Sequence, residues 1–451
     1  MDGRFDVAVI GGGVVGLAIL RRLAMAGLSC VLLEKGADIL SGASKGNSAL
    51  LHTGFDAPHG STELACMQAG YAEYLSIREK LNLPLLETSA LVVAWSEEER
   101  AALPGIVAKA HKNGVKDVAF LTQAEMHRRE PRLAASALAA VLVPGEHVID
   151  PWSSPLAYAH QAIAHGAVIH RKAEVRGAEL RGGAWTLSAG DVTVEAAIVV
   201  NAAGLFGDHV EAFARASPFH IKPRKGQFVV FDKPAARLVR AIILPVPTER
   251  TKGVVLFRTI FGNLAIGPTA EEAEEREAGT CDGATLQRLQ ARAIEMVPDL
   301  AHVGVNAIYA GLRPATEHKD YVIEALPGRN WITVGGIRST GLTGSLGIAG
   351  QVEALYARHF GKLPRKPAPL WTPVPMLAEH DNRPYQQGGD IVCHCEWVTR
   401  QEITDALAGP LPAGDLGGLK RRTRAMMGRC QGFNCGAEVR SLFVKAPHGK
   451  A

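Results

Sequence analysis

Long apolar runs are missing from this chain of 451 residues, although 47% of its residues are hydrophobic. No stretch approaches the roughly 18 consecutive apolar residues that cross a bilayer, so we expect no transmembrane helix. The start of the chain also lacks the basic and apolar segments of an export signal. We therefore expect a cytoplasmic protein, and peripheral docking on the inner face of a membrane stays compatible with the sequence.

The chain also has little net charge, with 49 basic and 45 acidic residues and a formal charge of +4. This balance is too weak to indicate nucleic acid as a main partner. Charged residues make up 21% of the chain, and this ordinary composition excludes a disordered chain, a collagen and a disulfide miniprotein. No internal repeats are visible, and the length predicts two or three domains.

Glycine is abundant instead, with 48 residues, many of them in short clusters. The pattern near the N-terminus predicts a strand over residues 5–10, a helix over 14–26 and a second strand over 29–33. Buried strands are also expected over 197–203 and 331–335. Strands that alternate with helices in this way are typical of an α/β fold with a parallel sheet.

Gly11, Gly13 and Gly16 form a G-x-G-x-x-G motif between the first strand and the first helix. The first glycine permits a tight turn, the second lets the backbone approach a pyrophosphate, and the third lets the helix pack on the strand. The helix N-terminus offers free N–H groups to phosphates. Glu34 ends the second strand, where a carboxylate can accept hydrogen bonds from a ribose. The motif in this position predicts a dinucleotide site.

Further glycine-rich segments follow the later strands, at residues 201–204, 335–337 and 341–344. Each of them would bring the backbone close to the ligand again. Several returning contacts suit a long, permanently bound dinucleotide better than an exchangeable nicotinamide nucleotide. We therefore expect FAD rather than NAD.

The chain resembles the FAD-dependent amino-acid oxidase/glycerol-3-phosphate dehydrogenase superfamily over nearly its whole length. The segments that carry the resemblance are residues 9–16, 46–54, 200–204, 311–314 and 341–343. The second segment, Asn-Ser followed by His-Thr-Gly, is the most specific. It is similar to anaerobic glycerol-3-phosphate dehydrogenase large subunits and to L-2-hydroxyglutarate dehydrogenases. The resemblance implies a Rossmann-like FAD-binding domain with an inserted antiparallel-sheet substrate domain.

The resemblance also implies which residues hold FAD. Ser41, Ser44 and Asn47 would line the flavin phosphate and ring region, and His52 would approach the isoalloxazine. The expected cofactor-binding residues are Gly11, Gly13, Val15, Gly16, Glu34, Lys35, Ser41, Ser44, Asn47, Ser48, Leu50, Val175, Ala203, Gly204, Gly336, Gly341, Leu342 and Thr343.

Four of the seven cysteines lie near the C-terminus, as the pairs Cys393-x-Cys395 and Cys430-x4-Cys435. In a cytoplasmic chain such a cluster indicates a metal site rather than disulfides. Four thiolates suit either zinc or an iron–sulfur cluster, and the spacing does not decide between them. His394 lies between two of the cysteines, but four thiolates already suffice as ligands.

The segment 427–435 resembles the bacterioferritin-associated ferredoxin-like [2Fe–2S] domain that ends anaerobic glycerol-3-phosphate dehydrogenase large subunits. This resemblance implies a small helical domain whose four cysteines bind one [2Fe–2S] cluster. We expect helices over 400–407, capped by Thr399, and over 418–427. The basic run 420–424 is interpreted as a solvated helix face near the cluster or a docking face for an acidic partner, not as a nucleic-acid site.

Together these elements predict an α/β protein in which the FAD-binding domain is discontinuous and the substrate domain is inserted twice. A proline-rich connector would lead from them to the [2Fe–2S] domain. The expected boundaries are 1–88, 145–215 and 310–365 for the FAD-binding domain, 89–144 and 216–309 for the substrate domain, 366–387 for the connector and 388–451 for the [2Fe–2S] domain.

Oxidation of an alcohol by a flavin also requires a base for the hydroxyl proton, and histidine titrates in the right range. His52 is the candidate, and the alternative is a histidine that only contacts the flavin or a carbonyl. Arg313 could clamp a carboxylate or phosphate with two hydrogen bonds, and the alternative is a structural ion pair. Arg258 and Lys225 are weaker candidates for substrate binding; relatives often carry small or neutral residues at the position of Arg258.

We therefore predict an FAD-dependent dehydrogenase for a small anionic 2-hydroxy acid or polyol phosphate, of the glycerol-3-phosphate or L-2-hydroxyglutarate type. FAD would take a hydride and pass electrons to the [2Fe–2S] cluster. The cluster implies an electron-acceptor protein, a membrane quinone system or a partner subunit, and an oligomer or hetero-complex. The alternatives are an amino-acid or opine dehydrogenase, because an amine needs no base, and an electron-transfer or redox-sensing subunit without its own substrate.

Overall fold

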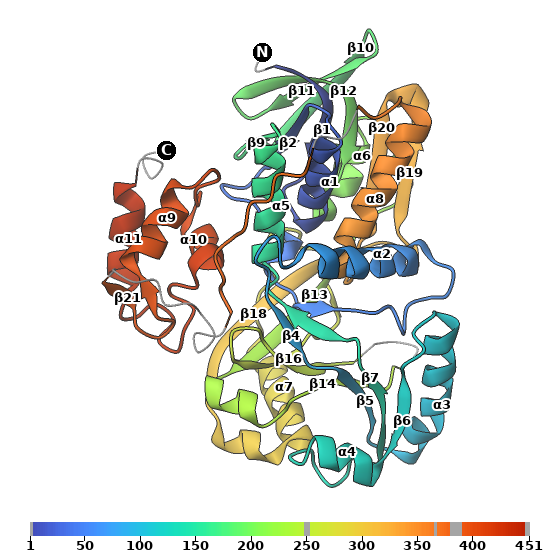
Figure 1. The fold of residues 1–451 in the computed structure, drawn as a ribbon, viewed down its shortest axis with the longest axis vertical. Helices are drawn as coiled ribbons and strands as arrows, with labels where there is room; N and C mark the ends of the chain where they lie inside the picture. Colours follow the sequence, from blue (N-terminus) through green and yellow to red (C-terminus); the bar gives the residue numbers. More distant parts are fainter. Residues whose placement is uncertain (1–2, 248–252, 365–367, 379–389, 447–451) are drawn as a thin grey trace.

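The computed structural model describes residues 3–247, 253–364, 368–378 and 390–446. Two large sheets lie one above the other along the long axis of the molecule, and a small helical domain lies against their flank (Figure 1). The upper sheet in this view is built around the N-terminal strand, and the lower sheet is largely antiparallel.

The first sheet has eight strands. The pairs at its centre, on both sides of the N-terminal strand, are parallel. Its strands are β1 (Arg4–Ile10), β2 (Cys30–Leu33), β9 (Val168–His170), β10 (Val175–Arg181), β11 (Ala184–Ala189), β12 (Val192–Asn201), β19 (Val322–Leu326) and β20 (Trp331–Gly335). Every side chain of β2 is buried, as in parallel strands covered on both faces. This arrangement confirms the predicted Rossmann-like core.

Helices cover both faces of the first sheet. On one face α1 packs against both α5 and α8, and α2 packs against α8, while α6 lies on the other face against β12 and β20 (Figure 1). These helices are α1 (Val14–Met25), α2 (Thr62–Ile77), α5 (Ser153–Ala164), α6 (Gly207–Glu211) and α8 (Gly341–His359). The buried leucines of α1, Leu17, Leu20 and Leu23, recur at helical spacing and form the centre of this core.

The second sheet has nine strands, and all its pairs are antiparallel except β14 with β5. Its strands are β5 (Ala90–Ala94), β6 (Ala119–Thr122), β7 (Ala139–Val143), β13 (Lys222–Phe231), β14 (Ile242–Pro245), β15 (Val255–Arg258), β16 (Leu264–Gly267), β17 (Glu271–Glu272) and β18 (Val305–Ala315). Side chains of β5 alternate between two cores, one with α3 (Glu97–Lys112) and one with α4 (Gln123–Arg129) and α7 (Gly283–Met296). This is the predicted antiparallel sheet.

A small antiparallel sheet connects the two parts. Its strands are β3 (Leu50–Leu51), β8 (His147–Ile149) and β4 (Leu85–Glu87). Short 3-10 turns occur at Ala43–Lys45, Gly204–Phe206, Lys233–Arg237, Pro298–His302 and Pro327–Arg329.

The C-terminal domain is small and helical, with a two-stranded sheet at its start. Its elements are β21 (Ile391–Cys393), β22 (Val398–Thr399), α9 (Arg400–Ala408), α10 (Leu416–Thr423) and α11 (Gly436–Lys445). Thr399 caps α9, as predicted from the sequence, and the side chain of Glu402 completes a capping box with it. The expected helix over 418–427 is wrong at its end, because α10 stops at Thr423 and Arg424 takes a left-handed conformation with φ of 71°.

Two of the expected segment limits can be compared with the fold, namely the domain boundary at residue 310 and the connector over 366–387. β18 crosses the boundary at residue 310, and its whole length pairs with β13 in the second sheet. The expected connector, 366–387, lies partly outside the described residues. The division into domains stays a proposal. No helix in the described part of the chain is both long and apolar enough to cross a membrane.

Candidate cofactor and active site

A cavity of about 510 Å³ lies where the two large sheets meet. Its wall combines the β1–α1 turn and the carboxyl ends of β2 and β20 from the first sheet with β13 and β18 from the second. Ligands of open parallel sheets bind outside the carboxyl ends of the strands. The position of the cavity therefore fits the predicted dinucleotide site.

The turn between β1 and α1 has the geometry that its glycines predict. Gly11 has φ of 111°, and a Cβ there would lie 2.5 Å from the carbonyl oxygen of Ala202. A Cβ on Gly16 would lie 2.0 Å from the carbonyl oxygen of Gly11, so only glycine lets α1 pack this closely on β1. Gly13 occupies the N-cap of α1 and has no side chain to cap it, so the helix N-terminus faces the cavity with N–H groups that suit phosphates.

Glu34 stands at the end of β2 with its carboxylate buried in the wall. Its Oε2 accepts a hydrogen bond from the N–H of Gly12 at 2.6 Å, and its Oε1 accepts one from the N–H of Gly36 at 2.7 Å. Burial raises the pKa of Glu34, and the two N–H groups oppose that shift. Each oxygen keeps a second lone pair, so the carboxylate can still accept ribose hydroxyls.

Most of the predicted cofactor-binding residues meet at this cavity. Three do not line it: Gly16 lies behind the turn, and the Thr343 hydroxyl bonds the carbonyl oxygen of Leu50 at 3.2 Å. The predicted residues in the wall are Gly11, Gly13, Val15, Glu34, Lys35, Ser41, Ser44, Asn47, Ser48, Val175, Ala203, Gly204, Gly336, Gly341 and Leu342, together with Arg313.

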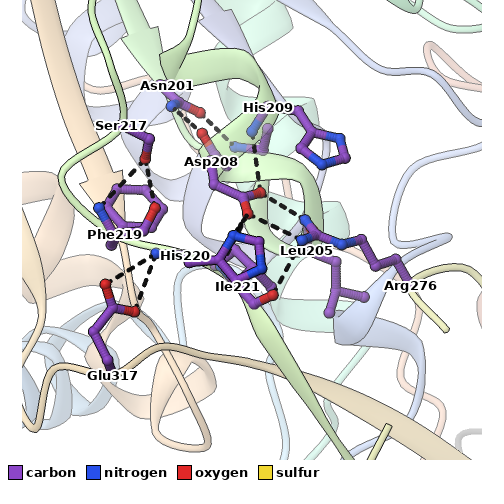
Figure 2. Close-up of polar contacts among 12 residues, drawn as sticks. Asn201, Leu205, Asp208, His209, Ser217, Phe219, His220, Ile221, Arg276 and Glu317 are labelled. Atoms are coloured by element: carbon purple, nitrogen blue, oxygen red, sulfur yellow. Dashed lines mark hydrogen bonds and ion pairs between the residues drawn. The ribbon is translucent and has the colours of Figure 1, made fainter. Parts of the chain in front are cut away.

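Arg276 also belongs to the wall, although sequence reasoning did not single it out. Figure 2 shows its guanidinium against Asp208: Nη1 bonds Oδ1 at 2.6 Å and Nη2 bonds Oδ2 at 3.0 Å. It also donates to the carbonyl oxygens of Leu205 and Ile221. The pKa of Asp208 is lowered; burial opposes this shift, and the hydrogen bonds from Arg276 and Ile221 produce it.

These contacts fasten the segment after β17, a part of the second sheet, to the first sheet. Lys35 adds to this connection between the two sheets, because its ammonium lies 3.5 Å from the ring centre of Phe206 and 3.1 Å from the carboxylate of Glu277. The only sequence signal was a single arginine within an acidic run, which does not indicate a partner about 70 residues away.

Arg313 crosses from β18 towards β13 and forms part of the same wall. Its Nη2 donates to the carbonyl oxygens of Thr269 at 2.6 Å and Lys225 at 3.1 Å, and its Nε donates to that of Arg224 at 3.3 Å. None of its hydrogen bonds within the described residues uses Nη1. Burial, followed by the nearby Arg224, lowers its pKa to about 10, so the group is a cation at neutral pH.

The two weaker substrate candidates lie elsewhere. Lys225 is paired with Glu271 at 3.1 Å and is not part of the cavity wall. Arg258 ends β15, and Leu256, on the same side of that strand, packs in the core with α7 rather than towards the cavity. The position of Arg258 does not support the predicted substrate contact, which stays untested.

His52 follows β3 and is held from two directions. Its N–H donates to the hydroxyl of Thr343 at 3.1 Å, next to the wall residue Leu342, but His52 itself is not part of the wall. Its Nδ1 lies 2.7 Å from Oε2 of Glu146, a carboxylate that is fully buried. Oε1 of Glu146 accepts hydrogen bonds from the N–H of Thr53 at 2.6 Å and from its hydroxyl at 2.8 Å.

The contact with Glu146 assigns the tautomer of His52. An ionised carboxylate only accepts hydrogen bonds, so the ring N–H that faces Glu146 is the one on Nδ1. Sequence reasoning missed Glu146, because a single glutamate in the β7–β8 turn carries no pattern that indicates a partner 94 residues away.

The four C-terminal cysteines lie together as two interacting pairs, Cys393 with Cys435 and Cys395 with Cys430. The first pair is buried and the second is partly exposed. The N–H of Asn434 is the main cause that lowers the pKa of Cys430, whereas burial raises that of Cys435 to about 12. Among the described residues no three His, Cys, Asp or Glu side chains converge on one point suited to a single metal ion.

Comparison with known proteins identifies the main part of the chain. Residues 6–355 match the family described as FAD dependent oxidoreductase. The chain belongs to this family. Residues 391–445 match a second family, the BFD-like [2Fe-2S] binding domain. This FAD-dependent oxidoreductase therefore binds FAD and a [2Fe–2S] cluster, and two pairs of thiols suit a cluster with two irons.

Individual relatives support the same assignment. The chain is 30% identical to a glycerol 3-phosphate dehydrogenase of Caloramator mitchellensis, over 98% of this chain and 94% of that one. It is 27% identical to human mitochondrial L-2-hydroxyglutarate dehydrogenase, over 60% and 62%. The solved structure of the L-alpha-glycerophosphate oxidase of Mycoplasma pneumoniae with FAD bound superposes with a TM-score of 0.76 at 25% identity, over 83% of this chain and all of that one. The protein is an FAD-dependent dehydrogenase.

Proposed function

We propose that this dehydrogenase oxidises a small anionic 2-hydroxy acid or polyol phosphate, of the glycerol-3-phosphate or L-2-hydroxyglutarate type. The observation that carries the proposal is Arg313, a cation in the cavity wall that is held by three carbonyl oxygens and by no carboxylate among the described residues. Its Nη1 is available to bind a carboxylate or phosphate. The names of two relatives, a glycerol 3-phosphate dehydrogenase and an L-2-hydroxyglutarate dehydrogenase, support the same substrate class.

The chain's own residues would divide the reaction between them. Arg313 binds the anionic group and orients the alcohol carbon, while His52 accepts the hydroxyl proton at Nε2. Glu146 holds Nδ1–H and stabilises the imidazolium that forms. FAD, when bound, supplies the hydride acceptor. We also propose that the predicted cofactor-binding residues in the cavity wall hold FAD. The cluster would be held by Cys393, Cys395, Cys430 and Cys435.

The cluster passes single electrons onwards, so the proposal includes an external acceptor, such as a one-electron carrier protein, a partner subunit or a membrane quinone system, and an oligomer or hetero-complex. Cys430→Ser should lose the EPR signal of the reduced cluster. Reduction of FAD by the substrate should survive, because the hydride goes to the flavin.

Anaerobic bleaching of the flavin tests the substrate class. The purified protein is mixed with glycerol 3-phosphate, L-2-hydroxyglutarate, several amino acids and opines, and the flavin absorbance is followed. We expect bleaching by one of the hydroxy compounds and a loss of roughly 10²–10⁴-fold in its rate for His52→Ala. Bleaching by an amine that is indifferent to His52→Ala would establish the amino-acid or opine alternative. Bleaching by no metabolite, with FAD and cluster in place, would leave an electron-transfer or redox-sensing subunit.

A further inference from the structure

Arginines of the basic run 420–424 form hydrogen bonds with another part of the same chain. Arg422 donates from Nη1 and Nη2 to the two carboxylate oxygens of Asp38, at 2.5 and 2.8 Å, and both side chains are buried. Arg421 donates to the carbonyl oxygen of Ile39 at 3.0 Å. Asp38 and Ile39 precede the cavity residue Ser41 by only a few positions. The run therefore fixes the [2Fe–2S] domain to the segment that follows β2 of the first sheet, at the flank seen in Figure 1.

Arg424 makes a second contact of a different kind. Its guanidinium carbon lies 3.9 Å from the ring centre of Phe261, in the turn between β15 and β16. The same guanidinium is paired with Glu396, with Nη2 3.1 Å from Oε2, and both side chains are 6% exposed. Glu396 directly follows Cys395, one of the partly exposed cysteines. Arg424 thus joins the second sheet to the residue beside a cluster ligand.

Phe261 continues this contact towards the cavity. Its ring stacks on Trp152, with centroids 5.5 Å apart and planes inclined by 13°. Nε1 of Trp152 donates to the carbonyl oxygen of Lys45 at 3.2 Å, and the neighbouring residues Pro151 and Gly46 line the cavity. Side-chain contacts, with short stretches of backbone at either end, therefore connect the cofactor cavity with the segment that carries Cys395.

We propose that electrons pass from FAD to the [2Fe–2S] cluster of the same chain through the contact formed by Trp152, Phe261 and Arg424. Each step transfers one electron from reduced FAD to the cluster and converts one ferric ion to ferrous. The hydride leaves one proton on the flavin, and that single proton is released to solvent once both electrons have left. No bond between heavy atoms forms or breaks. A one-electron carrier protein then reoxidises the cluster before the second electron follows.

The contact also places a charge beside the cluster. Reduction adds one negative charge to the cluster. The guanidinium of Arg424 neutralises the carboxylate of Glu396 beside Cys395, a charge that would otherwise oppose the reduced state. The ion pair with Glu396, the residue after Cys395, holds this guanidinium over the ring of Phe261. Arg424 is accordingly a positioning residue, whose removal changes both the rate of electron transfer and the reduction potential of the cluster.

Phe261→Leu tests the route, because it keeps an apolar side chain and removes the ring. Phe433→Leu is the matched control, since Phe433 is also close to the cluster, with its N–H on the carbonyl oxygen of Cys430, but its side chain is 91% exposed. Both variants retain the clamp between Arg422 and Asp38. Small-angle scattering of each holoenzyme establishes that the [2Fe–2S] domain stays docked.

Flash photoreduction measures the transfer without any substrate. A 5-deazariboflavin radical gives one electron to FAD under anaerobic conditions, and absorbance follows its passage to the cluster. We expect transfer to slow severalfold in Phe261→Leu and to stay unchanged in Phe433→Leu. A wild-type rate in docked Phe261→Leu, or an equal loss in both variants, would overturn the route. The outcome is independent of the substrate proposed above.

Arg424→Met and Arg424→Lys test the positioning role separately. A redox titration followed by EPR should give a lower midpoint potential of the cluster in Arg424→Met, and a potential close to wild type in Arg424→Lys, which keeps the charge. Transfer should be slower in both, because lysine cannot stack its head flat on Phe261. An unchanged potential and rate in Arg424→Met would refute the role of Arg424.

Discussion

Two arginines in the wall of the same cavity have different surroundings. Arg276 is bonded to both oxygens of Asp208, so its charge is neutralised by the protein. Arg313 is bonded to three backbone carbonyl oxygens and, within the described residues, to no carboxylate. The first arginine therefore joins two parts of the fold at the cavity, whereas the second has no neutralising carboxylate, which is why we propose that it binds the anionic substrate. Burial in a cavity wall alone does not separate these roles; the partner of the guanidinium does.

The strongest test of this contrast is Arg313→Met. We expect kcat/KM for the anionic substrate to fall by roughly 10²-fold or more, because truncating one side of a buried charge pair costs about 2–5 kcal/mol. The FAD content of the purified protein should not change. Steady-state kinetics and the flavin spectrum measure both quantities. Arg313→Lys should lose less, and an unaltered KM in Arg313→Met would show that the substrate binds elsewhere.

The substitution Glu146→Gln tests in the same way how a partner sets the role of a charged group, here for a buried carboxylate paired with His52. We expect kcat to fall by roughly tenfold or more, because the amide can orient His52 but cannot stabilise its protonated form. KM should change little, because the substitution leaves Arg313 in place. Thr53→Ser, which keeps the hydroxyl on Glu146, is the control. A loss of thermal stability with an unchanged kcat would make Glu146 purely structural.

Arg276→Met should give the converse result to Arg313→Met. We expect KM to remain near its original value, while FAD dissociates about tenfold faster, because two charge-assisted hydrogen bonds that hold the closing segment are lost. Release of flavin fluorescence after dilution measures this rate. If Arg276→Met instead raises KM without loosening FAD, the two arginines have exchanged the roles assigned here.

The smallest expected effect is the pH dependence of FAD release, which follows the ion pair of Arg276 with Asp208. The pKa of Asp208 is lowered in the folded protein, so its contribution is fully present above the ordinary aspartate value near 3.9 and is lost as the pH falls below it. FAD release from the wild type should therefore accelerate only at the acid end, relative to Asp208→Asn. Equal pH dependence of the two proteins would exclude Asp208 as the titrating group.

Local patterns predicted the parts of the site that depend on neighbours in the chain. Gly16 is required by the close approach of α1 to β1 and Gly11 by its φ of 111°, and such a turn is encoded within about ten residues. The same holds for Thr399, whose capping box with Glu402 lies within one helical turn. The end of α10 was misplaced because Arg424 takes a left-handed conformation, which a sequence without glycine there does not indicate.

The sequence by itself determined that this protein has a dinucleotide-binding βαβ unit and a four-cysteine domain, because both are written in short, regular spacings. Only the tertiary structure decided which charged groups meet. The pair of His52 and Glu146 spans 94 residues, that of Asp208 and Arg276 spans 68, and that of Asp38 and Arg422 spans 384. Such partners are selected by the packing of separate sheets and domains, and no periodicity along the chain records them.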